Sequence, residues 1–177
     1  SLVAAAVVAV LGLAIILVLA GLALSVALNR AEARDKPSDE LPPFARYEAV
    51  VERENRLGTQ NHLTGLSVMK AGWLRRLALR VSFFVIRFAA VYVFRPGYLG
   101  GINTIHFARW VLLPGTDRLV FFSNYGGSWE SYLEDFITKA HYGLTGVWSN
   151  TLGFPRSRYL FRDGASDGDR FKRWARN

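Results

Sequence analysis

The sequence predicts an α+β protein with a single N-terminal transmembrane helix followed by a ferredoxin-like domain of βαββα order. Two observations lead to this prediction. Residues 2–28 form an uninterrupted apolar run, and the chain after them alternates short apolar strands with two segments of helical periodicity. In a βαββαβ unit two helices cover one face of an antiparallel sheet, so this order leaves the fourth strand missing or weak.

The apolar run is the first element. Residues 2–28 contain no charged side chain, and about 20 apolar residues are enough to cross the hydrocarbon core of a bilayer. A cleaved signal peptide is the alternative, but the run is longer than the apolar core of an ordinary signal and no basic residue precedes it. We therefore expect a single-pass membrane anchor.

The charges that flank the run predict its orientation. No Lys or Arg precedes it, whereas Arg30, Arg34 and Lys36 follow directly, together with the acidic residues Glu32 and Asp35. The positive-inside rule then places the N-terminus outside and the soluble domain on the cytoplasmic side of the inner (cytoplasmic) membrane. The chain has no cysteine, which suits a reducing compartment and excludes thiolate catalysis and cysteine-ligated metals.

Residues 29–58 connect the anchor to the domain. The first part, to residue 43, is polar and proline-bearing and predicts a linker, while residues 44–58 mix charged and apolar side chains as a short amphipathic helix does. The ferredoxin-like domain then occupies residues 59–177. We expect it to be truncated at its C-terminal end, because the fourth strand should follow residue 177 or be the weaker stretch 159–162.

Within the domain, the pattern predicts a strand, a helix, a hairpin of two strands and a second helix. Residues 61–70 alternate as a strand does, and no Gly or Pro interrupts the helix that begins at Gly72 and ends at residue 94. The strands at residues 104–113 and 118–124 are separated by Pro-Gly-Thr-Asp, which suits a type II turn.

The stretch NYGGSWESYLEDF, residues 124–136, combines glycines, aromatic rings and carboxylates, and it could be an active-site loop or a joint between a strand and a helix. Ser128 is placed to cap a helix from residue 129 to about 142, with Gly143 after its end. The aromatic residues recur on one face of this helix, so Glu130 and Glu134 fall on the outer side. We therefore interpret the stretch as a joint and assign no catalytic residue.

The helix at residues 72–94 is the most informative segment, because residues 72–110 contain six arginines and no Asp or Glu. Its apolar sector is wider than one sheet face needs. Two interpretations stay open: a core helix with a thin solvated stripe, or a helix that covers the sheet on one side and rests in the lipid headgroups on the other. Nucleic acid is excluded as a partner, because the basic groups alternate with apolar runs. The predicted lipid-facing residues are Trp73, Arg76, Arg80, Phe84 and Arg87.

Five motifs carry a resemblance: HFARW at 106–110, FSNY at 122–125, GSWESY at 127–132, VWSNT at 147–151 and GFPR at 153–156. Residues 55–177 resemble a poorly characterised bacterial family of ferredoxin-like α+β proteins, loosely akin to dye-decolourising-peroxidase-like and dimeric α+β-barrel proteins. The resemblance suggests His106 and Arg109 as the residues that a ligand or haem would contact. We carry over no catalytic residue and expect no cofactor or metal.

These observations favour a non-catalytic accessory or assembly subunit of a larger membrane complex, such as a respiratory or photosynthetic assembly. Its partners would be membrane lipids and either other subunits or a homodimer mate. The alternative is a membrane-bound enzyme of peroxidase or oxygenase type, whose site is completed beyond residue 177 or by a partner chain.

Overall fold

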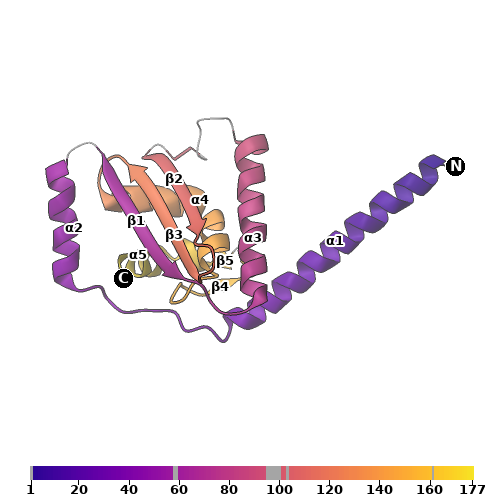
Figure 1. Cartoon of the computed structure of the whole chain (residues 1–177), viewed down its shortest axis with the longest axis horizontal. Coiled ribbons are helices and arrows are strands. Elements are labelled where there is room, and N and C mark those ends of the chain that lie inside the picture. Colours follow the sequence, from indigo (N-terminus) through magenta and orange to yellow (C-terminus); the bar gives the residue numbers. More distant parts are fainter. Residues whose placement is uncertain (1, 58–59, 95–100, 103, 161) are drawn as a thin grey trace.

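The computed structural model describes residues 2–57, 60–94, 101–102, 104–160 and 162–177, without the side chains of residues 54–57. The protein combines a long apolar N-terminal helix with a domain of mixed helix and sheet, as Figure 1 shows. The predicted α+β class is therefore confirmed, and so is the presence of one helix that is long and apolar enough to cross a membrane.

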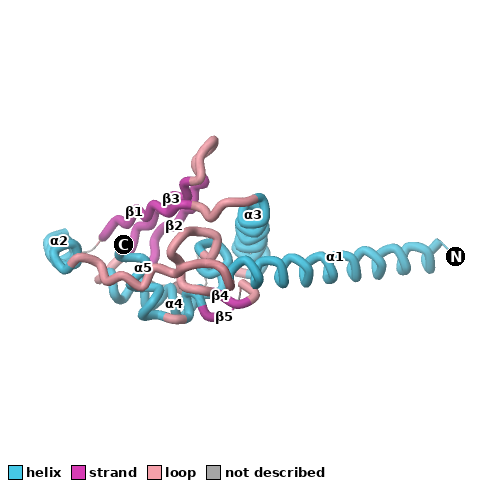
Figure 2. Tube along the Cα trace, turned by 90° about the horizontal axis from the view of Figure 1, so that it is seen from below, coloured by secondary structure: helices cyan, strands magenta, loops and turns pink. Residues whose placement is uncertain are grey.

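Helix α1, Leu2–Glu32, projects away from the rest of the molecule in both views (Figures 1 and 2). It continues past the boundary predicted at residue 28, since no glycine or proline interrupts its last turns. Leu28 and Glu32 on these turns are buried in the domain. The residues that we predicted as the start of a linker thus belong partly to the helix and partly to its contact with the domain.

The main sheet has three antiparallel strands in the order β1-β3-β2, with β1 at Asn61–Val68, β2 at Ile105–Leu112 and β3 at Arg118–Tyr125. The turn between β2 and β3 has the predicted type II features, because Gly115 has a φ of 73° and the amide of Thr116 donates to the carbonyl of Leu113 at 3.2 Å. One face of the sheet lies on the core, and the other exposes aromatic side chains of β2 and β3.

Two long helices pack with the sheet. Helix α3 is Trp73–Phe88 and is followed by a π-helical turn at Ala89–Val93, so the predicted helix is present with a change of winding near its end. Helix α4 is Trp129–Trp148 and lies on the core face of the sheet (Figure 2). It supplies most of the aromatic core, including Trp129, Tyr132, Phe136 and Trp148.

The prediction that α4 ends at Gly143 was wrong, because the helix runs on to Trp148. Gly143 and Gly146 instead face α3, where the hydroxyl of Ser82 donates to the carbonyl of Gly146 at 2.7 Å. These glycines let the two helices approach closely. The predicted start is confirmed, since the Ser128 hydroxyl accepts from the amide of Ser131 at 3.2 Å.

The remaining elements surround this core: α2 at Phe44–Leu57, β4 at Ser157–Arg158, β5 at Arg162–Asp163, a 3-10 turn at Gly164–Ser166 and α5 at Gly168–Arg176. Helix α2 matches its prediction and stands beyond the outer edge of β1 (Figure 1). The weak strand predicted at residues 159–162 was wrong: among the described residues β4 and β5 pair with each other and not with the main sheet, and a turn occupies residues 159 and 160.

Candidate functional site

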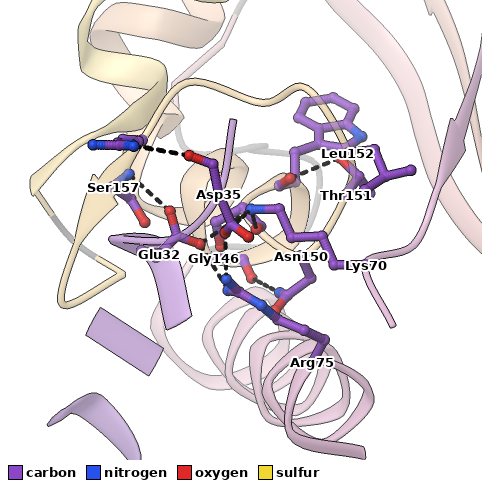
Figure 3. A network of polar contacts seen from close by, with 12 residues as sticks. Glu32, Asp35, Lys70, Arg75, Gly146, Asn150, Thr151, Leu152 and Ser157 are labelled. Carbon is purple, nitrogen blue, oxygen red and sulfur yellow. Dashed lines mark hydrogen bonds and ion pairs between the residues drawn. The ribbon is translucent and has the colours of Figure 1, made fainter. Parts of the chain in front are cut away.

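Four charged side chains meet where α1 joins the domain, and we call them the junction cluster: Glu32, Asp35, Lys70 and Arg75 (Figure 3). The Lys70 ammonium lies 3.2 Å from Glu32 Oε1 and 2.6 Å from Asp35 Oδ2. The Arg75 guanidinium reaches the same two oxygens at 2.7 and 2.6 Å. Each carboxylate is therefore shared by two cations, and the four charges balance.

The junction cluster is withdrawn from water. The exposed fraction of the side chain is 3% for Glu32, 4% for Arg75, 8% for Lys70 and 23% for Asp35. A charge moved from water to a protein interior is costly unless it is paired, and removal of one partner from a buried pair costs about 3–5 kcal/mol. The ion pairs therefore hold the end of α1 against the domain. Removal of any one partner would leave a buried charge without its full pairing.

Backbone groups of the segment after α4 complete the junction cluster. Lys70 Nζ donates to the carbonyl of Ser149 at 2.7 Å, and the amide of Ser157 donates to Glu32 Oε2 at 3.1 Å. The Arg156 guanidinium donates to the Asp35 carbonyl at 3.0 and 3.1 Å. The junction therefore joins segments that are more than a hundred residues apart in sequence.

The motif residues VWSNT fold into the floor of the junction. Asn150 and Thr151 are fully buried, and their side chains donate to the carbonyls of Gly146 at 2.9 Å and Trp148 at 2.7 Å. The side chain of Asn150 thereby closes the last turn of α4. The VWSNT motif, one of the five that carry the resemblance, thus has a structural role: it positions the Ser149 carbonyl, which accepts from Lys70.

The junction cluster was not predicted from the sequence, although one signal for it was present. At 100° per residue, Arg75 lies about 100° from Arg76 and so falls outside the stripe formed by Arg76, Arg80 and Arg87. An arginine on the apolar side of a helix needs an anion beside it. The carboxylates at 32 and 35, which we placed in a linker, were the candidates.

Opposite its packed side, α3 exposes a broad apolar face that continues onto the π-helical turn after it. The exposed fraction is 75% for Trp73, 69% for Phe84 and 74% for Tyr92, while Ala78 and Leu79 on the other side are buried. Single exposed apolar residues are ordinary, but a continuous patch of this kind marks a membrane or protein contact. We call it the α3 face, formed by the side chains of Trp73, Leu77, Val81, Phe84, Val85, Phe88, Val91 and Tyr92.

The five residues predicted to face lipid all lie on the surface of α3, since Arg76, Arg80 and Arg87 are exposed together with Trp73 and Phe84. Their contact with lipid stays a prediction. Arg76 and Arg80 follow the buried Arg75 closely, so the first turns of α3 contribute to the junction cluster on one side and to the surface on the other.

The other residues considered from the sequence do not form a reaction centre in the part of the chain that is described. His106 and Arg109 are both exposed on β2. Glu134 of α4 pairs with Lys172 of α5 at 2.6 Å, and Glu130 contacts Arg176, so these carboxylates fasten one helix to the other. Among the described residues, no group of three or more His, Cys, Asp or Glu side chains could hold a metal ion.

No protein-family model, curated protein or solved structure matches this chain. The geometry must therefore carry the functional interpretation by itself. It consists of a membrane-length helix, a buried group of charges that fixes the end of that helix to the domain, and an exposed apolar helix beside the junction.

Proposed function

We propose that the protein is a single-pass membrane protein whose α+β domain is held against the bilayer, where it acts as a non-catalytic accessory or assembly subunit of a larger membrane complex. The observation that carries this proposal is the junction cluster, because it fixes the domain to the end of α1. Residues 2–23 of α1 have almost no buried side chain and span roughly 33 Å at 1.5 Å per residue, about the hydrocarbon thickness of a bilayer.

The junction cluster also favours an anchor over a cleaved signal peptide. Leu28 has no exposed surface and Glu32 is 2% exposed, so both are part of the folded domain. If α1 were removed with these residues, Lys70 and Arg75 would share the single carboxylate of Asp35. A segment destined for removal has no need of such contacts.

The same contacts support the predicted orientation. Because Lys70 and Arg75 neutralise Glu32 and Asp35, the net charge left on residues 29–36 is that of the exposed basic residues Arg30, Arg34 and Lys36. This basic flank favours a domain on the cytoplasmic side of the inner membrane, with the N-terminus outside.

The α3 face supports contact with the bilayer. The first turn of α3 supplies Arg75 to the junction cluster, so α3 starts where α1 leaves the domain (Figure 1). Its apolar side chains would enter the interfacial region, and Arg76, Arg80 and Arg87 would reach anionic headgroups at about 1 kcal/mol each.

The strand order supports a ferredoxin-like domain as the finer description of the fold. In such a unit the first and third strands are antiparallel neighbours and the second lies outside the third, which is the order β1-β3-β2 found here. The outer edge of β1, where such a unit has its fourth strand, is left open by the strands described here. The resemblance to the bacterial ferredoxin-like family stays a prediction.

Gentle extraction of native membranes tests the proposal. We expect the protein to remain in the membrane after an alkaline carbonate wash, and to leave it in mild detergent together with other subunits at a fixed stoichiometry. A protein that the carbonate wash releases, or that migrates alone on native gels at its own mass in every mild detergent, would contradict the proposed role.

A further inference from the structure

A long groove lies between α2 and the outer edge of β1. Its volume is about 980 Å3, and its floor includes the rings of Phe121, Tyr125 and Trp148 from the aromatic core. Tyr47 and Val50 of α2 line the opposite wall. The groove is thus as long as a strand, apolar at its base and bounded on one side by the edge of a sheet.

The groove borders the outer edge of β1, and this edge is already paired at its C-terminal end. The amide of Lys70 donates to the carbonyl of Asn150 at 2.8 Å, and the amide of Leu152 donates to the carbonyl of Val68 at 2.8 Å. These contacts lie on the side of β1 away from β3, because the neighbouring Met69 directs its amide toward the β3 side. Among the described residues, this pairing does not extend along the rest of the edge.

Backbone groups alternate between the two sides of a strand, so the N–H and C=O groups of His62, Thr64 and Leu66 point to the same outer edge. Within the described part of the chain, no residue pairs with them. Unpaired groups along a sheet edge are a template for another strand, which natural proteins cover or block. Here neither a charge nor a proline on β1 blocks the edge.

The charges around the groove indicate what kind of segment would bind there. Arg46 and Arg53 of α2 line it, and no Asp or Glu is among the described residues that do. Arg176 also lines it, but its guanidinium is already paired with Glu130. Arg53 projects from α2 with an exposed side chain. A second copy of β1 carries no acidic residue that could meet these cations, whereas a segment with carboxylates at its ends would.

We propose that the outer edge of β1 binds an extended segment of a partner subunit, which adds a strand with alternating apolar side chains and acidic ends. Its apolar side chains would cover the core beside Gly65, where β1 has no side chain of its own. Its backbone would pair with His62, Thr64 and Leu66. This inference rests on the proposed accessory role and adds to it the place and chemistry of the contact with the partner.

A defined probe tests the site. The full-length protein in mild detergent is titrated with the synthetic peptide EVTVTVE and with KVTVTVK, which has the same apolar residues and opposite end charges. We expect the acidic peptide to bind at least tenfold more tightly, and to slow hydrogen exchange at the amides of His62, Thr64 and Leu66. Equal affinity for the two peptides, or no binding of either, would overturn the proposal.

A matched pair of variants locates the binding. Thr64→Pro removes an outward amide and leaves the ladder to β3 intact, while Thr64→Val keeps that amide. We expect about a fivefold loss of affinity for the acidic peptide in T64P only, as for one lost hydrogen bond. Arg53→Glu should reverse the preference between the peptides, and Arg109→Glu, outside the groove, should not.

Hydrogen exchange measured without peptide tests two alternative occupants of the groove, namely the protein's own chain and a second copy of it. Slow exchange at Thr64 and Leu66 in a monomer would mean that the protein's own chain fills the groove, and slow exchange only in a dimer would mean that a second copy does. Either result overturns the assignment to a partner segment. If peptide binding fails while the protein still leaves the membrane with other subunits, this inference is wrong and the proposed function stands.

Discussion

At the scale of single residues, the contrast between Arg75 and Arg76 explains how α1 is fixed. The two are adjacent in sequence, but Arg75 is buried between two carboxylates and Arg76 is exposed on the surface of α3. Helical periodicity separates them by about 100°, which predicts different surroundings for the two side chains. It does not predict which carboxylates pair with Arg75. The partners come from positions 32 and 35, and only the fold brings them there.

This contrast predicts different costs for the same substitution. Arg75→Met leaves Glu32 buried beside a single ammonium, so we expect the free energy of unfolding to fall by about 3–5 kcal/mol. Arg76→Met removes an exposed charge and should change it by no more than about 0.5 kcal/mol. Chemical denaturation in mild detergent, followed by tryptophan fluorescence, measures both. Equal values for the two variants would mean that the junction cluster does not hold the fold together.

At the scale of elements, the main strands and helices could be predicted from periodicity, but the ends of α1 and α4 and the weak strand at residues 159–162 could not. The hairpin turn, the Ser128 cap and the aromatic face of α4 agree with their predictions, because each depends on residues close in sequence. Gly143 was interpreted as the end of α4, because a glycine after a periodic segment usually ends a helix. Its place against Ile86 of α3 is a tertiary contact that no local pattern contains.

The two glycines of α4 predict opposite effects for one substitution. A Cβ at Gly143 would lie 3.8 Å from Ile86, an ordinary contact, so Gly143→Ala should stabilise the helix by about 0.5–1 kcal/mol. A Cβ at Gly146 would lie 3.1 Å from the Ser82 hydroxyl and would push α3 away, so Gly146→Ala should destabilise the protein. Thermal unfolding in detergent measures the sign. A gain of stability in G146A equal to that in G143A would contradict the close approach of the helices.

At the scale of the whole molecule, the sequence predicts the anchor and the exposed arginines of α3, and the structure adds how they are joined. Composition alone predicts α1, because an apolar run of this length without charges is long enough to cross a membrane. The residues of the junction cluster come from two separate stretches of sequence, 32–35 and 70–75, so their meeting depends on the fold. For the same reason the open edge of β1 becomes visible only when the strand order is known.

The central claim is that the domain rests on the bilayer through the α3 face. Since the chain has no cysteine, a spin label at Phe84→Cys is unique, and Phe122→Cys on the open face of the sheet gives a matched exposed aromatic position. Collision rates with oxygen and with a water-soluble nickel complex are measured for the full-length protein in liposomes that contain anionic lipid. We expect the label at residue 84 to collide mainly with oxygen, which concentrates in lipid, and the label at residue 122 mainly with nickel. Equal access of nickel to both labels would contradict the claim.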